Sequence, residues 1–148
     1  MTDRKRFVNR ELSWLRFNSR VMLEAERPHN PPLERAKFLA IVSSNLDEFF
    51  MVRVGKLERK IDAGLRINDP AGLTPLQQVR AIRRMVLKQV ARQYAIYNDQ
   101  VVPLLADNGL RILSPDELSD VQRTWLTGYF DTQVMPVLTP RTINPSHP

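Results

Sequence analysis

Apolar residues recur at every third or fourth position along most of this chain, and this spacing restricts it to a helical fold. The clearest case is a long helix that Thr74 and Pro75 begin, as an N-cap and a first-turn proline. Pro103 is expected to kink or shorten its end, and Asn108–Gly109 to close it. Its inward-facing residues are expected to be Val79, Ile82, Val86, Val90, Tyr94, Tyr97 and Val101.

The same periodicity predicts further helices before the long one. A first helix follows a cap at Ser13, and a second begins at Pro32. Asn45 stands three residues before Glu48, which is the spacing of a capping box. We therefore expect one helix to end at this point and another to begin there and stop near Gly64. The large aromatic residues expected to build the core are Trp14, Phe17, Phe38, Phe49 and Phe50.

The end of the chain has a different pattern. Ser114–Glu117 combines a cap, a first-turn proline and a glutamate at the capping-box position, and so predicts the start of another helix. A short extended segment is expected over Val134–Pro140, and residues 141–148 show no core-forming pattern. Because a terminal strand needs a partner for its backbone, we expect an N-terminal piece of a longer protein. The predicted fold is an all-α helical bundle with one long helix at residues 1–108, followed by the truncated start of the next domain at 109–148.

The charge and composition favour anion binding and exclude several kinds of chemistry. Lys and Arg number 22 against 16 Asp and Glu, and the net charge of +6 indicates an acidic partner such as nucleic acid, nucleotide phosphates, another polyanion or an anionic membrane surface. Without cysteine there is no thiolate chemistry, and His29 and His147 form no spaced ligand motif. No phosphate-binding G-x-x-x-x-G-K-[ST] loop occurs. The apolar runs are too short for a membrane helix, so a cytoplasmic protein is expected.

Two kinds of charged cluster remain as candidate sites. Asp47 and Glu48 are adjacent and would point about 100° apart on a helix, so they suit the first turn of a helix better than an acid–base pair. Two basic sets have helical spacing and could face either an anion or solvent. They are Arg53, Lys56, Arg59 and Lys60, and then Arg80, Arg83, Arg84, Lys88 and Arg92. From the residues alone, the chain is a basic, largely helical anion-binding or adaptor domain.

Several segments resemble a known family more specifically. Phe7–Asn18, Lys37–Ile41 and the string Ser43–Val54 (S-S-N-L-D-E-F-F-M-V-R-V) closely resemble the N-terminal domain of the long bacterial polyphosphate kinases. The resemblance is strong from Phe7 to Gly55, weaker through the long helix, and returns at Pro136–Pro140 and at Pro145–Pro148. The last two segments resemble the entry to that family's head domain.

The resemblance implies an activity for the complete enzyme. Members of this family reversibly transfer the terminal phosphate of ATP to inorganic polyphosphate, using Mg²⁺ and a phosphohistidine intermediate. They are cytoplasmic homo-oligomers, also expected at the inner membrane as peripheral proteins, whose catalytic histidines lie in C-terminal domains that this chain lacks. Neither His29 nor His147 matches the phosphorylated histidine, so the metal ligands and the nucleophile are expected outside this chain, which should be inactive alone.

One site residue carries over from the resemblance. In the family, the Asn of S-S-N-L-D-E contacts the adenine of ATP, and this position is Asn45 here. If the Asn45 oxygen caps the following helix, only its NH₂ group remains free for a nucleotide. The alternative from the residues alone is a helical module that binds nucleic acid, or acts as an adaptor, through the basic Arg80–Arg92 face. The two hypotheses differ in ligand: ATP, ADP and polyphosphate for the first, and nucleic acid or a partner protein for the second.

Overall fold

Helices form the regular structure of residues 6–141, the part of the chain that this computed structural model describes. The prediction of an all-α fold is confirmed, and no strand occurs in this range. The expected head-domain entry at Pro145–Pro148, with His147, lies outside the described residues. The helices are α1 (Arg10–Leu23), α2 (Pro32–Glu48), α3 (Gly55–Asp62), α4 (Pro75–Ile96), α5 (Val102–Asp107) and α6 (Asp120–Tyr129). Short 3₁₀ turns occur at Glu24–Glu26, Pro115–Glu117 and Met135–Val137.

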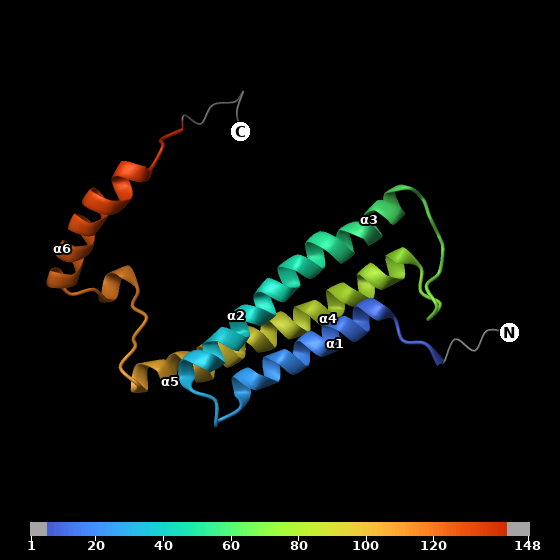
Figure 1. The fold of residues 1–148 in the computed structure, drawn as a ribbon, viewed down its shortest axis with the longest axis horizontal. Helices are drawn as coiled ribbons and strands as arrows, with labels where there is room; N and C mark the ends of the chain where they lie inside the picture. Colours follow the sequence, from blue (N-terminus) through green and yellow to red (C-terminus); the bar gives the residue numbers. More distant parts are fainter. Residues whose placement is uncertain (1–5, 142–148) are drawn as a thin grey trace. The chain divides into compact units, whose positions relative to one another are not determined.

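The chain divides into two units, residues 1–111 and residues 112–148. In the first unit, α1, the α2–α3 segment and α4 lie side by side (Figure 1). The start of α1 lies near the start of α4, because Asn9 donates a hydrogen bond to Gln78. Near its other end α1 shares a cluster with Ile96, so α1 and α4 run parallel and α2 runs against both. The first unit is therefore an up-down-up helical bundle.

Local capping signals set most helix ends of this bundle. Thr74 and Gln77 form the predicted capping box at the start of α4, and α2 begins at Pro32 as expected. Gly64 and Gly109 adopt φ angles of 67° and 82°, the left-handed conformation that suits glycine after a helix. The cap of α1 is Asn9, whose side-chain oxygen accepts from the Leu12 N–H at 2.9 Å, so the prediction of Ser13 is wrong.

The predicted helix break at Asn45–Glu48 is also wrong. Asn45, the predicted N-cap, lies within α2, whereas an N-cap residue needs an extended conformation. Glu48 and Phe49 after it also keep right-handed helical dihedrals. The Phe49 N–H donates to the carbonyls of Asn45 and Leu46, so the helical hydrogen bonds continue through this point. The Asn45 side chain caps no helix, and its NH₂ group donates to Asn18 on α1 instead.

In place of a break, the helix contains a π-helical segment at Phe49–Val54. Buried positions step by three or four residues from Leu39 to Phe49 and then by five to Val54. The same five-residue step separates Ile96 from Val101, across a second π-helical segment at Tyr97–Val101. Each wide turn returns the apolar side chains to the bundle interior, which is how the helices stay amphipathic.

The bundle core consists of two apolar clusters. One includes Met22, Val42 and Ile96, and the other includes Leu15, Phe49 and Ile82. Between them, polar side chains are buried on α1 and on α4: Asn18, Gln89 and Gln93. Among the aromatic residues expected in the core, Phe49 is buried and Trp14 and Phe38 are partly buried. Phe17 and Phe50 are exposed, and so is Tyr94 of the long helix, because the buried stripe on each helix is offset from the predicted one.

The second unit differs from the prediction at both ends. Ser114 begins only the 3₁₀ turn Pro115–Glu117, and α6 begins later, with a capping box formed by Ser119 and Gln122. The expected extended segment from Val134 is not confirmed, because a π-helical segment at Phe130–Val134 leads into the 3₁₀ turn Met135–Val137. Extended backbone begins only at Leu138, with φ −79° and ψ 135°. Across residues 6–141, no helix is both long and apolar enough to cross a membrane.

Candidate functional site

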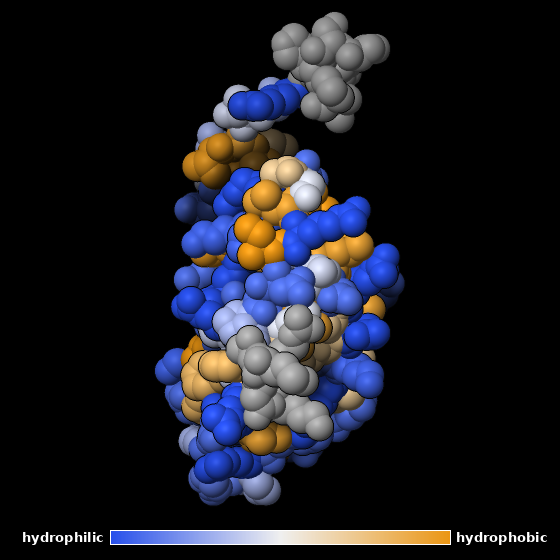
Figure 2. Space-filling view, turned by 90° about the vertical axis from the view of Figure 1, so that its right-hand side faces the viewer, coloured by the Kyte–Doolittle hydropathy of each residue, from blue (hydrophilic) through white to orange (hydrophobic). Residues whose placement is uncertain are grey.

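A cavity of about 670 Å³ lies in the first unit where α1 begins. Its walls come from the residues before and within α1, from the π-helical segment and α3, and from the loop before α4. Aromatic side chains, amides and charges of both signs line it, including Trp14, Asn45, Glu48, Arg53, Lys56, Lys60 and Asp69. On the face of the molecule drawn in Figure 2, hydrophobic residues likewise form separate patches among hydrophilic ones.

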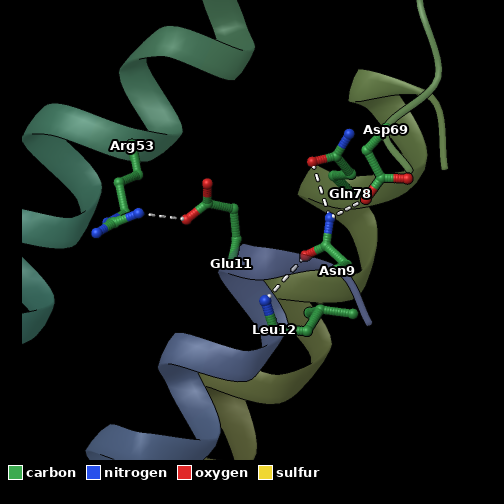
Figure 3. A network of polar contacts seen from close by, with 6 residues as sticks. All are labelled: Asn9, Glu11, Leu12, Arg53, Asp69 and Gln78. Carbon is green, nitrogen blue, oxygen red and sulfur yellow. Dashed lines mark hydrogen bonds and ion pairs between the residues drawn. The ribbon is translucent and has the colours of Figure 1, made fainter. Parts of the chain in front are cut away.

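A buried amide holds one wall of this cavity together (Figure 3). Asn9 is 5% exposed, and its NH₂ group donates to Asp69 at 2.6 Å and to the Gln78 side chain at 3.0 Å. The other oxygen of Asp69 accepts from the backbone N–H of Leu73 at 2.7 Å. Since Asn9 also caps α1, one side chain joins the helix start to the loop and to α4.

An ion pair and an aromatic stack form the facing part of the site. Arg53 of the π-helical segment lies 3.2 Å from the Glu11 carboxylate, a contact that Figure 3 shows reaching across from α1. The Arg53 guanidinium also lies 6.0 Å from the centre of the Trp14 ring, which stacks on Phe49 with ring centres 4.6 Å apart. These contacts hold Arg53 in place from two sides, because its charge is paired and its planar group covers an aromatic face.

Asn45 lies on the cavity wall, half-buried, in the last turn of α2. Its NH₂ group donates to the side-chain oxygen of Asn18 at 3.0 Å. Asn18 is fully buried in α1 and donates to the backbone carbonyl of Val42 at 3.2 Å. The Asn45 oxygen accepts no hydrogen bond from the described residues, so the expected competition between capping and ligand binding does not occur.

The cavity has cationic groups to offer an anion. Arg10, Lys56 and Lys60 line it and form no ion pair with another residue of the described part of the chain. Glu48 and Asp69 also line it, and Asp69 is engaged with Asn9 and Leu73. Phosphate groups are the natural ligands for such cations beside an amide and an aromatic ring.

The other predicted clusters lie away from this cavity. Asp47 lines a separate groove between α2 and α4, whereas Glu48 lines the cavity, so the two carboxylates face different spaces and do not begin a helix. On α4, Arg92 pairs with Glu26, and the remaining basic residues of that face, Arg80, Arg83, Arg84 and Lys88, are exposed. His29 lies exposed in the turn between α1 and α2.

Sequence reasoning missed the amides that organise the site. Asn9, Asn18 and Gln78 are buried, yet polar residues at these positions were assigned to no role. For Asn18 a signal exists, because it stands at helical spacing between Leu15 and Met22 on the buried face of α1. A polar residue inside an apolar stripe indicates a specific hydrogen-bond partner.

Comparisons with known proteins all find the same family, over most of the chain. The family model described as the polyphosphate kinase N-terminal domain matches residues 7–113. The polyphosphate kinases of Mycolicibacterium gilvum and Halalkalibacterium halodurans are 48% and 50% identical over 143 residues, which cover 97% and 96% of this chain. The crystal structure of polyphosphate kinase from Porphyromonas gingivalis is similar, with a TM-score of 0.79 and 33% identity over 95% of this chain. The chain spans 20% of the length of each of these three proteins.

Proposed function

This chain belongs to the polyphosphate kinase N-terminal domain family, and we propose that it is the nucleotide-binding helical domain of an enzyme that makes polyphosphate from ATP. In that reaction the terminal phosphate of ATP is transferred reversibly to a polyphosphate chain through a phosphohistidine. We propose that the phosphorylated histidine lies outside this chain and that the domain is inactive alone. We propose that the complete enzyme is cytoplasmic and homo-oligomeric.

The position of Asn45 carries the proposal for this domain. Its amide lies on the wall of a cavity large enough for a nucleotide base, and its oxygen has no partner among the described residues. An amide offers an acceptor and a donor side by side, which matches the exocyclic amine and a ring nitrogen of adenine. We propose that Asn45 forms this contact with ATP and ADP.

The cations of the same cavity support a role in holding phosphates. Lys56 and Lys60 lie one helical turn apart on α3, and both line the cavity beside Arg10. Cations spaced along one helix attract a polyanion by their summed field, which raises its local concentration. Arg53 contributes less charge because Glu11 neutralises it. We propose that this set draws ATP or polyphosphate toward the active site.

The described residues do not form a magnesium site of their own. In residues 6–141, no group of three or more His, Cys, Asp or Glu side chains is close enough to hold a metal ion. Mg²⁺ in proteins binds a few carboxylates together with substrate phosphates. We propose that Mg²⁺ enters with ATP and is held by parts of the enzyme beyond this chain.

Steady-state kinetics of the complete enzyme test the role of Asn45. The Asn45→Ala variant should raise KM for ATP about tenfold, because one hydrogen-bonding group at the base is lost. Asn98→Ala, which changes an exposed amide on a π-helical segment, is the matched control and should leave KM unchanged. An unchanged KM in a folded Asn45→Ala enzyme would refute the contact. The 148-residue chain with ATP and Mg²⁺ should make no polyphosphate.

A further inference from the structure

A layer of buried amides separates the two apolar clusters of the bundle. On α1, Asn18 lies between Leu15 of one cluster and Met22 of the other, and it is fully buried. On α4, Gln93 is also buried and donates to the Leu39 carbonyl and to the Ser43 hydroxyl. Of these two amides, Asn18 is the one that contacts the cavity wall among the described residues, through its hydrogen bond with Asn45.

The hydrogen bonds of Asn18 determine which way its amide faces. A backbone carbonyl can only accept, so the group of Asn18 that contacts the Val42 oxygen must be NH₂. The other end of the Asn18 amide is then an oxygen, which can only accept in its turn. The group of Asn45 that contacts it must therefore be NH₂. This sequence of donors and acceptors leaves the oxygen of Asn45, and the second hydrogen of its NH₂ group, for a ligand.

A fixed amide can distinguish two purine bases that a rotating amide accepts equally. Adenine carries an amine at position 6 and guanine carries a carbonyl, so the two bases present opposite groups in the same pose. An amide free to turn over could match either pattern. An amide held with its oxygen toward position 6 accepts from the adenine amine, but it faces the guanine oxygen with a second acceptor. Two acceptors that face each other without a hydrogen between them disfavour binding.

We propose that Asn18 is a positioning residue that makes the nucleotide site selective for adenine. It touches no nucleotide and acts by holding the Asn45 amide in one orientation. This inference rests on the proposed contact between Asn45 and the base. Asn18 lies on the buried face of α1, so its position alone gives no indication of a role in recognition.

The test compares ATP with GTP in the complete enzyme. In Asn18→Leu, which keeps the branched shape and the number of side-chain heavy atoms but removes both hydrogen bonds, the Asn45 amide can turn over. The ratio of kcat/KM for ATP to that for GTP should fall about tenfold, mainly through improved use of GTP. A ratio that stays at the wild-type value in the folded variant would overturn the proposal. Asn18→Ala repeats the test without a bulky side chain if the leucine variant does not fold.

Gln93→Leu is the matched control, because it removes a buried amide from the same layer without touching Asn45. It should change the midpoint of thermal unfolding but leave the ratio of kcat/KM for ATP to that for GTP unaltered. A fall in this ratio as large as that of Asn18→Leu would show that the Asn18 effect is only structural, and would overturn the proposal. Asn45→Ala separates the two proposals. If it leaves KM for ATP unchanged, the base contact itself fails. If it raises KM while both Asn18 variants keep the wild-type ratio, only the positioning role fails.

A measurement without substitution gives an independent check. In the ¹⁵N-labelled chain, the side-chain NH₂ groups of Asn18 and Asn45 should exchange with water more slowly than that of the exposed Asn98, because both donate hydrogen bonds inside the bundle. Slow exchange at both side chains would support a fixed orientation. Exchange of the Asn45 amide at the rate of Asn98 would overturn it.

Discussion

The two units of this chain form helices by the same local rules but stabilise them differently. Thr74 begins α4 and Ser119 begins α6, each through a capping box with a glutamine three residues later. On α4 the helix then buries Ile82 and Ile96 in two apolar clusters. On α6 no residue is buried, and Val121 and Trp125 remain 80% and 65% exposed. Capping therefore sets where a helix begins, whereas packing decides whether it is held.

The largest expected difference between the units is in hydrogen exchange. Amides of Ile82 and Val42 lie in the bundle core and should exchange only through global unfolding, which in small domains costs about 5 to 15 kcal/mol. Amides of Trp125 and Tyr129 on α6 should have an opening free energy of only about 1 to 2 kcal/mol, since no residue of that helix is buried. Equal protection in the two units of the isolated chain would contradict the comparison.

Truncation of a large side chain in each unit gives the next largest contrast. Phe49→Ala removes a ring that is 1% exposed and stacked on Trp14, so it should lower the free energy of unfolding by about 3 to 5 kcal/mol. Trp125→Ala should change it by less than about 0.5 kcal/mol, because that ring is mostly exposed. Phe50→Ala changes an exposed ring in the same π-helical segment and is the control. Urea denaturation measures the free energy of unfolding of all three variants. A loss of similar size for Trp125 would show that α6 has a packed partner.

The caps provide a smaller contrast. Asn9→Ala removes an N-cap and leaves Asp69 and Gln78 without a shared donor, so about 2 kcal/mol of stability should be lost. Ser119→Ala removes a solvent-exposed cap, so the helical signal of α6 should fall while the unfolding midpoint of the bundle stays in place. Circular dichroism with urea denaturation separates these outcomes. A shift of the bundle midpoint by Ser119→Ala would mean that the two units unfold together.

The smallest expected effect distinguishes ion pairs that join helices from those within one helix. Glu11 and Arg53 are partly buried and join α1 to the π-helical segment, whereas Glu34 and Lys37 are exposed neighbours on α2. A double-mutant cycle should give at most about 1 kcal/mol for the first pair, and salt should weaken it. The same cycle on Glu34 and Lys37 should give a smaller coupling energy. If that exposed pair couples as strongly, the partial burial of Arg53 has no energetic importance.

The sequence predicts features that depend on neighbouring residues and misses those that depend on distant ones. Pro32, Thr74, Gly64 and Gly109 were placed correctly because a cap or a stop needs only the adjacent backbone. The break at Asn45 was wrong because the local capping-box pattern is overridden by the packing of Leu46 and Phe49. The five-residue steps between buried positions, from Phe49 to Val54 and from Ile96 to Val101, have no local signal, since they follow from packing against the other helices.

The candidate site was predictable only in part, for the same physical reason. Asn45 was predicted from the resemblance to a family. Its place on a cavity wall depends on how the helices of the bundle pack. Asn9 and Asn18 act through partners on other helices or loops, up to 69 positions away in the sequence. A pattern within a single helix contains no information about such partners. Their role becomes visible only when the three helical segments are side by side.

The π-helical segment at Phe49–Val54 changes the angle between the face that α2 buries and the face that α3 buries. Each residue of an α-helix turns the chain by about 100°, so one extra residue in a turn rotates everything that follows by that angle. The face that α2 turns to α1 and the face that α3 turns to the cavity are thereby set separately. An inserted or deleted residue between Phe49 and Val54 would leave Asn45 where it is and turn Lys56 and Lys60 away from it. The relative angle between the amide and the cations is thus encoded in a residue count and not in any single side chain.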